Sequence, residues 1–463
     1  FGAVEYCHAE VLRRLRRASL ARLRAEVEPV EQTALGRFLP AWHGVGTGHR
    51  RLRSAPTVED VLGVVEQLAG APVPASALES LVLPARLPGY SPALLDELST
   101  AGEVTWTGCG ALAGSDGWVA LAPTDVADLL LPDLDDALEQ GPLHRAVLAA
   151  LGPGGALFFR QLADRVGAQL VAEGSVEPAD GEVVAALWDL VWAGLVTNDS
   201  LAPLRALVSG RGAAHRPRRS PPRGRYARMR SGRPAMSSRT GPPTVAGRWS
   251  LAPVPETDPT RRAHARAEAF LERHGVLTRG ALETERVTGG FAAVYRVLRT
   301  MEESGRCRRG YVVEGLGAAQ FAVPGAIDRL RSLGRADDMQ DREAIVLAAA
   351  DPAQPYGAAL AWPPPTGEVR HRPGRKAGAL AVLVDGAPTL YVERGGRSLL
   401  SFSEDTEVLR SAVTALAAAV QDGWLGTLSV QRADGEPAWA SVLADLLREA
   451  GFRATPRGLR LRA

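Results

Sequence analysis

Two acidic residues in this sequence are candidates for catalytic work, because a carboxylate can hold or activate a water molecule. Asp351 lies in AAADP and Asp385 lies in VDGA. General acid–base chemistry requires such a group beside the reacting atoms. Both residues also have a structural interpretation, since Asp385 precedes a glycine and Asp351 precedes a proline, as turn residues do. No complete catalytic constellation is recognisable, and Asp351 is kept as the acidic candidate.

Nucleotide and metal sites are not indicated by the sequence. A P-loop reads GxxxxGK[ST], and the single lysine, Lys376, lies instead in GRKAGAL. The histidines show neither HExxH nor i, i+4 spacing, and Cys7, Cys109 and Cys307 lie far apart. We therefore expect no metal and no cofactor in this chain, no ATP hydrolysis by it, and a reducing cytoplasmic compartment.

Arginine and tryptophan residues point more strongly to nucleic acid. Arginines hold phosphates, and a tryptophan on a hairpin can stack on an unpaired base. The alternative is that the tryptophans pack in a core and that the arginines only solvate a surface. The candidate DNA contacts are Arg13, Arg14, Arg16 and Arg17 of an N-terminal helix, Trp106 and Trp118 of a first hairpin, Arg218 and Arg219 of a basic segment, and Arg306, Arg308 and Arg309 of a later hairpin.

The positive charge of the chain is concentrated in one segment. The net charge is only +2, yet residues 211–239 hold ten arginines and no acid. Residues 210–247 lack apolar periodicity and are rich in Arg, Pro, Ser and Gly, so we predict a disordered linker. Its arginines would release counterions from a duplex and bind it without sequence preference; the alternative is a tether whose charge keeps it soluble.

The elements that would position these residues repeat along the chain. Three times, helical patterns are followed by a glycine and a strand pattern, and these glycines are Gly102, Gly194 and Gly305. A glycine at a helix end can take the positive φ that turns the chain into a strand. Helices closed by a β-hairpin form a winged helix. We predict tandem winged helices rather than an all-helical solenoid, which has no use for the strands.

The chain length and the pattern of the last third predict the number of domains and the fold class. A chain of 463 residues is long enough for three or four domains, and short alternating runs in the last third predict a β-meander. The predicted fold class is α+β, with tandem winged helices followed by a small β-rich, barrel-like α+β domain. The predicted segments are a basic helical segment (1–51), winged helices 1 to 3 (52–135, 136–209 and 248–335), the linker (210–247) and the β-rich domain (336–463).

Two further features concern membranes and completeness. The longest apolar run, near residues 412–420, is shorter than the roughly 20 residues that span a bilayer, so no membrane partner is expected. Phe1 stands where an initiator methionine is usual. We therefore interpret the chain as part of a longer protein.

Three stretches of the sequence resemble the large helicase-related (Lhr) family of bacterial DNA-repair helicases, in the region beyond the ATPase core. They are RRASLARLRAEVEPVEQTALGRFLPAW (16–42), VEQLAGAPVPASALESLVLPARLPGYSPALLDELSTAGEVTW (65–106), and 267–331, which runs from AEAFLERHGVLTRG to AAQFAVPGAIDRLR. The resemblance implies the C-terminal portion of a helicase whose upstream lobes would use ATP and Mg²⁺. It also implies DNA, single-stranded or duplex, and the helicase core as partners, allows a homo-oligomer, and implies a cytoplasmic, nucleoid-associated location.

The resemblance also carries an alternative function. The family's C-terminal segment is similar in layout to winged-helix DNA glycosylases, which excise damaged bases such as uracil or alkylated bases. Excision needs an acid or amide that places water at the sugar after the base is flipped out. The Gln-x-Gln/Asp motif of those glycosylases is not found; Gln320 in AAQFAVP is the nearest family-like glutamine and joins Asp351 as a catalytic candidate.

Overall fold

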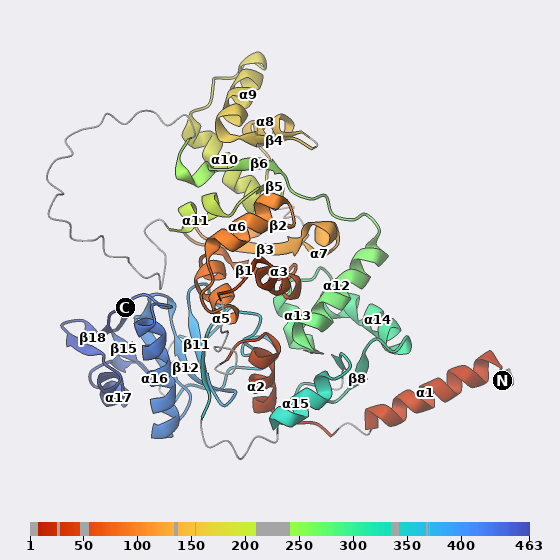
Figure 1. Ribbon diagram of the computed structural model, residues 1–463, viewed down its shortest axis with the longest axis vertical. Coiled ribbons are helices and arrows are strands. Elements are labelled where there is room, and N and C mark those ends of the chain that lie inside the picture. The colour runs from red at the N-terminus through yellow and green to blue at the C-terminus, as the bar shows by residue number, and fades with distance from the viewer. Residues whose placement is uncertain are drawn as a thin grey trace.

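The computed structural model describes residues 8–25, 28–46, 55–133, 138–152, 154–209, 241–317, 319–334, 342–366, 369 and 371–463 and, within them, not the side chains of residues 16, 17 and 20–25. Short sheets and helices alternate along the chain, which confirms the α+β class (Figure 1). None of the described helices combines the length and the apolar content that crossing a bilayer requires.

The first winged-helix unit begins with a helix that is capped by its own side chains. The Thr57 hydroxyl accepts from the backbone N–H of Asp60, and the Asp60 carboxylate accepts from that of Thr57, which completes a capping box. Gly102 ends the third helix at φ 81°. The strands form an antiparallel sheet of order β1-β3-β2. The elements are α3 (Val58–Gln67), β1 (Val73–Pro74), α4 (Ala75–Ala77), a π-helical turn (Leu78–Val82), α5 (Leu83–Arg86), α6 (Pro92–Ala101), β2 (Val104–Ala111), β3 (Gly117–Pro123) and α7 (Ala127–Leu130).

The second unit takes its central strand from beyond the predicted linker. Strand β6 pairs with both neighbours in an antiparallel sheet of order β4-β6-β5. We predicted a linker over 210–247 and a new unit from 248, but β6 completes the second unit, and the turn just before it buries Val245. Residues 210–240 lie outside the described residues. The elements are α8 (Pro142–Leu151), β4 (Ala156–Phe158), α9 (Phe159–Ala172), α10 (Asp180–Trp192), β5 (Val196–Asn198), α11 (Ala202–Val208) and β6 (Arg248–Leu251).

The third unit repeats the same order of helices and strands. Its antiparallel sheet has the order β7-β9-β8, and Gly305 follows the third helix at φ 84°. Each unit therefore places its last strand between the other two. The elements are α12 (Pro259–His274), β7 (Val276–Leu277), α13 (Arg279–Thr284), α14 (Gly290–Glu303), β8 (Arg308–Gly310), β9 (Gln320–Ala322) and α15 (Ala326–Gly334).

The last third of the chain is built on a six-stranded mixed sheet of order β10-β11-β12-β13-β15-β16, with one parallel pair between β13 and β15. Helix α16 packs across β10, β11 and β12, and a separate sheet has the order β14-β18-β17. Asp385 takes φ 49° in the turn between β11 and β12, which confirms it as a turn residue. The elements are β10 (Ala344–Ala348), β11 (Leu380–Val384), β12 (Ala387–Val392), β13 (Ser398–Ser401), α16 (Thr406–Gln421), β14 (Leu428–Val430), β15 (Arg432–Ala433), β16 (Glu436–Pro437), α17 (Ala444–Glu449), β17 (Arg453–Thr455) and β18 (Gly458–Leu461).

The N-terminal segment, predicted as one basic stretch, contains two helices with different surroundings. Helix α1 (Ala9–Ala25) extends to one side of the molecule (Figure 1). Helix α2 (Gln32–Trp42) packs against α15 and buries Phe38 completely. A Cβ on Gly36 would lie 1.9 Å from the carbonyl oxygen of Gly386, so glycine there allows α2 to approach the β11–β12 turn. The segment is therefore partly built into the body of the chain.

Candidate nucleic-acid interface

The third helix of a winged helix is the element that can enter a DNA groove, and α6, α10 and α14 hold that place here. The exposed charged residues of α14 are Arg296, Arg299 and Glu303. Arg296 and Arg299 share one face because they are three positions apart, and Arg299 lies 3.4 Å from the Glu303 carboxylate. The exposed charged residues of the other two helices are Glu97 on α6 and Asp180, Glu182 and Asp189 on α10. Acidic side chains repel phosphates, so α14 is the helix whose charge suits DNA.

Helices α6 and α10 are instead used between the first two units. On α6, Asp96 forms an ion pair with Arg205 of α11. The end of α10 lies against the first hairpin so closely that a Cβ on Gly117 would lie 2.4 Å from the Trp192 ring. The Thr197 hydroxyl of β5 donates to the Trp106 carbonyl at 2.6 Å. These contacts join the two units.

The hairpin of the third unit holds three of the predicted arginines in three different settings. Arg308 is exposed, and no carboxylate of the described residues pairs with it. Arg306 is also exposed but forms an ion pair with Glu268. Arg309 is half-buried and donates to the Tyr295 hydroxyl. Arg308 is thus available to a phosphate, whereas Arg309 fastens the hairpin to α14.

The two predicted tryptophans of the first hairpin differ in the same way. Trp106 is fully buried in the core, which corrects its assignment as a DNA contact; an alternating strand pattern does not reveal which face is covered by the neighbouring unit. Trp118 is half-buried, and the guanidinium carbon of Arg286 lies 4.2 Å from its ring centre. Arg286 has a φ of 52° and reaches across from the α13–α14 loop of the third unit. This geometry is a cation–π contact between two units.

The remaining predicted arginines lie at the edge of the described chain or beyond it. Arg13 and Arg14 are exposed on α1, and Arg13 lies 3.4 Å from the Glu10 carboxylate. The side chains of Arg16 and Arg17 are outside the described residues, as are Arg218 and Arg219. Their assignment as DNA contacts stays a prediction.

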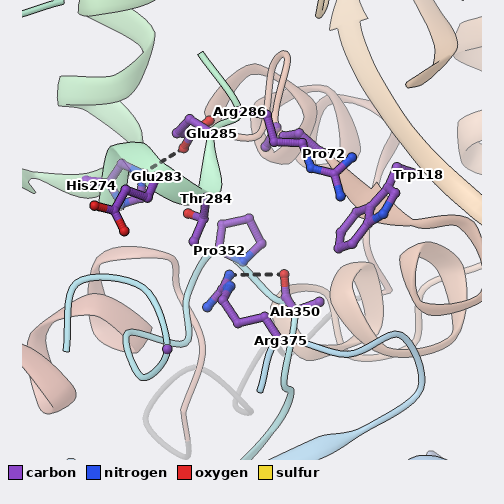
Figure 2. Close-up of a pocket in the computed structure, with 12 residues that line it drawn as sticks. Pro72, Trp118, His274, Glu283, Thr284, Glu285, Arg286, Ala350, Pro352 and Arg375 are labelled. Atoms are coloured by element: carbon purple, nitrogen blue, oxygen red, sulfur yellow. Dashed lines mark hydrogen bonds and ion pairs between the residues drawn. The ribbon is translucent and has the colours of Figure 1, made fainter. Parts of the chain in front are cut away.

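A pocket of about 250 Å³ lies where the first unit, the third unit and the β-rich domain meet. Figure 2 shows Trp118 and Arg286 on one side of it, Glu283 and Glu285 on another, and Pro352 with Arg375 below. Its lining residues are Ala71, Pro72, Trp118, His274, Glu283, Thr284, Glu285, Arg286, Ala350, Pro352, Gly357 and Arg375. An aromatic face, a cation and carboxylates thus converge on one cavity, as in many ligand sites.

The floor of the pocket is held by a buried charged network that includes Asp351. Its carboxylate accepts from Arg86 at 2.7 and 2.9 Å, and both side chains are almost fully buried. The second Arg86 nitrogen also lies 3.1 Å from His43 Nδ1; burial lowers the pKa of His43 well below its usual value, and Arg86 lowers it further. Asp351 therefore positions the floor. Its assignment as a catalytic acid is wrong, because both oxygens are occupied and away from solvent.

Arg375 fixes the same loop from the other side. Its guanidinium donates to the carbonyl oxygens of Gln354 at 2.6 Å, Ala350 at 3.1 Å and Asp351 at 2.9 Å. Burial lowers the pKa of Arg375 to about 10. The buried Arg86 and the half-buried Arg375 thus hold one short loop, and removing these charges from water costs desolvation energy that their hydrogen bonds offset.

Gln320, the amide candidate, is also a structural residue. Its side-chain oxygen accepts from the N–H groups of Val312 and Val313 at 3.2 and 2.8 Å, and its nitrogen donates to the carbonyls of Val313 and Gly317 at 2.8 and 2.7 Å. The residue is fully buried. Its side-chain oxygen and nitrogen thus both bind the backbone of the hairpin in the third unit, which corrects its assignment as a catalytic amide.

One wall of the pocket carries a second buried ion pair. Glu285 pairs with Arg273 and accepts from His274 Nε2 at 2.7 Å. Burial alone would raise the pKa of Glu285, but the two basic partners outweigh it and hold that pKa at about 2. Arg273 also donates to the Gln67 carbonyl at 3.3 Å, so this pair joins the third unit to the first.

Several residues of this interface were not singled out from the sequence. Arg296 and Arg299 lie in a stretch predicted as helical, and their three-residue spacing was the available signal. Arg286 and Glu283 carry no such signal, because their importance comes from the neighbouring unit and not from their own segment. Arg375 lies beside the only lysine in a segment that shows no pattern.

Comparison with known proteins places these features in a family. Sequence models described as large helicase-related protein, winged-helix domain, match residues 30–124 and 256–342. The first range contains the first winged-helix unit except α7, and the second contains the whole third unit. The first match also includes α2, which we had assigned to a separate segment.

Two relatives extend the similarity to nearly the whole chain. The Lhr helicase/probable uracil glycosylase of Mycolicibacterium smegmatis is 50% identical over 473 residues, which cover 99% of this chain and 30% of that protein. The Lhr helicase/uracil glycosylase of Escherichia coli strain K12 is 38% identical over 469 residues, with 97% of this chain and 30% of that protein covered. The resemblance seen in the sequence is thereby confirmed, and the chain belongs to the large helicase-related (Lhr) family.

Proposed function

We propose that this chain is the DNA-binding module of a DNA-repair helicase and that its third winged-helix unit contacts the DNA backbone. The observation that carries the proposal is the charge of α14: its exposed side chains include Arg296 and Arg299 with one acid, Glu303, which pairs with Arg299 at 3.4 Å, whereas the exposed charges of α6 and α10 are all acidic. The exposed Arg308 of the adjoining hairpin extends the same basic surface. A groove-entering helix and a wing with matching charge are what a duplex requires.

The proposal predicts binding that depends on salt. Each arginine that neutralises a phosphate releases condensed counterions, so the logarithm of the binding constant falls by about 0.9 per phosphate for each logarithmic unit of salt. Replacing two such arginines should reduce both the affinity and this slope. A helix that only packs against protein would leave both unchanged.

The test is fluorescence anisotropy of the full chain with duplex and single-stranded oligonucleotides at several salt concentrations. We expect Arg296→Gln/Arg299→Gln to lower duplex affinity and to reduce the slope by about 1.8. The matched control is Arg160→Gln/Arg165→Gln on α9, which removes the same charge from the acidic second unit and should change the slope little. Equal effects of the two double variants would overturn the assignment to α14. An affinity that does not change with salt concentration would show that phosphate contacts do not drive the binding.

Base excision is the second candidate function, and the pocket favours it. Besides being named as helicases, the first relative above is described as a probable uracil glycosylase and the second as a uracil glycosylase. In this chain, the pocket is lined by Trp118, whose ring Arg286 contacts on one face, and by the exposed carboxylate of Glu283, which belongs to α13 and is not buried in a network as Asp351 is. A flipped base could stack there while the carboxylate holds a water.

An excision assay separates the two functions. A uracil-containing oligonucleotide is incubated with the chain and then treated with alkali, and strand cleavage reports base loss. We expect product from the wild type, and loss of product in Glu283→Gln with an unchanged melting temperature. Arg279→Gln, which removes the partner 4.0 Å from Glu283, is the control and should keep the product. No product from the wild type would leave the DNA-binding role alone.

A further inference from the structure

The last hairpin of the chain occupies the position of a wing. Strands β17 and β18 follow the short helix α17, and Gly451 between helix and strand has a φ of 98°. With β14 they form an antiparallel sheet of order β14-β18-β17, in which the last strand lies between the other two. This is the strand order of the three winged-helix units. The hairpin therefore stands where those units carry a wing.

Four arginines of this hairpin face solvent without an acidic partner. Arg453, Arg457, Arg460 and Arg462 are all exposed, and no carboxylate of the described residues forms an ion pair with any of them. Among the other arginines of the same domain, Arg448 pairs with Asp445 at 2.7 Å and the half-buried Arg410 pairs with Glu449, whereas Arg397 and Arg432 are exposed and form no ion pair with a described carboxylate. The hairpin is distinguished by its density of such side chains, since its four arginines lie within residues 453–462.

The strand register fixes where these side chains point. Leu459 and Leu461 are buried, so the alternation of a strand turns Arg460 and Arg462 to the outer face. Arg453 lies directly opposite Arg460 in the antiparallel pair, so both share that face. Like charges directly opposite each other destabilise a sheet. A sheet that keeps two facing arginines gains when an anion lies between them.

We propose that the outer face of the β17–β18 hairpin is a second contact for the DNA phosphate backbone. This extends the DNA-binding function proposed above and rests on it. The hairpin and α14 lie on opposite sides of the molecule (Figure 1), so the contact is separate from that of the third unit. The planar guanidinium of arginine binds phosphate oxygens in pairs, and a cross-strand pair can hold one phosphate from two sides.

The test measures salt dependence on a duplex of about 40 base pairs, which is about 136 Å long at 3.4 Å per pair and can reach both surfaces. In the full chain, Arg453→Gln/Arg460→Gln should weaken binding and reduce the salt slope by about 0.9, because the pair holds one phosphate. Its melting temperature should stay the same or rise, because a repulsion is removed. The control Arg410→Gln/Arg448→Gln removes the same charge from paired arginines and should leave the slope near that of the wild type.

The α14 variant serves as the third arm and separates the two proposals. If Arg296→Gln/Arg299→Gln reduces the slope and Arg453→Gln/Arg460→Gln does not, the hairpin is not a DNA contact and the third unit is. If only the hairpin variant reduces the slope, the DNA contact at the hairpin is supported and the assignment to α14 is wrong. A wild-type chain that binds no DNA at low salt overturns both.

Discussion

The ion pair between Arg86 and Asp351 makes a strong prediction about stability, because its partners come from distant parts of the chain and neither reaches solvent. Their side chains are 1% and 0% exposed, and the two hydrogen bonds measure 2.7 and 2.9 Å. Asp351→Asn keeps the shape but leaves the Arg86 charge buried without its counterion. Breaking a buried pair in this way costs about 3–5 kcal/mol. At about 2–4 °C per kcal/mol, the melting temperature of the affected unit should fall by about 6–20 °C.

The assay is differential scanning calorimetry of the full chain with three variants. Asp351→Asn and Arg86→Met should each show the loss, whereas Arg86→Met/Asp351→Leu should recover most of it, because no charge is then left buried. The part that stays lost is the hydrogen bond from Arg86 to His43, about 1–3 kcal/mol for a buried unsatisfied group. If Asp351→Asn costs less than about 1 kcal/mol, as an exposed pair would, the structural role derived for Asp351 is refuted.

Three further predictions concern packing, pH and capping. Gly117→Ala should cost about 1–3 kcal/mol in a thermal melt, because its Cβ would lie 2.4 Å from the Trp192 ring, whereas Gly63→Ala on α3, with no atom within 4 Å, should be neutral or stabilising. The pKa of Glu285 is about 2 in the folded chain and near 4.5 in the unfolded chain, so the ionised carboxylate stabilises the fold above pH 4.5 and this stability is lost as the pH falls toward 2. Glu285→Gln should therefore be less stable than the wild type at neutral pH. Thermal melts at pH 7 and pH 3 should show that the difference in melting temperature between the two proteins is smaller at pH 3. Thr57→Ala should lower the free energy of unfolding, measured with urea, by about 1 kcal/mol. A change near zero would show that the capping box does not stabilise α3.

Local rules account for the parts of this fold that were predicted from the sequence. A glycine ends each third helix with a φ of 80–84°, as the pattern of Gly102, Gly194 and Gly305 required, because only the local backbone decides that feature. The pairing of Arg86 with Asp351 could not be predicted in the same way, since 265 residues separate them. Trp106 shows a similar limit, because its burial depends on contacts beyond its own strand.

The site was less predictable than the fold for a related reason. The basic face of α14 follows from helical spacing alone, but the pocket depends on how three units meet. Arg286 reaches Trp118 across a unit boundary, and nothing in either segment indicates the partner. The hairpin of β17 and β18 was predicted only as part of the β-rich domain, and the strand order alone relates it to the wings.

The late arrival of β6 has a consequence for how the protein is made. The second unit has every other element by Val208, but its central strand is not synthesised until Leu251. At about 5–20 residues per second, the ribosome needs about 3–10 s to pass from the end of β5 to the end of β6. During that interval, β4 and β5 lack the strand that joins them, and the site of Trp249 in the core stays unfilled. A gene fragment that stops at residue 209 would hold the chain at this stage permanently.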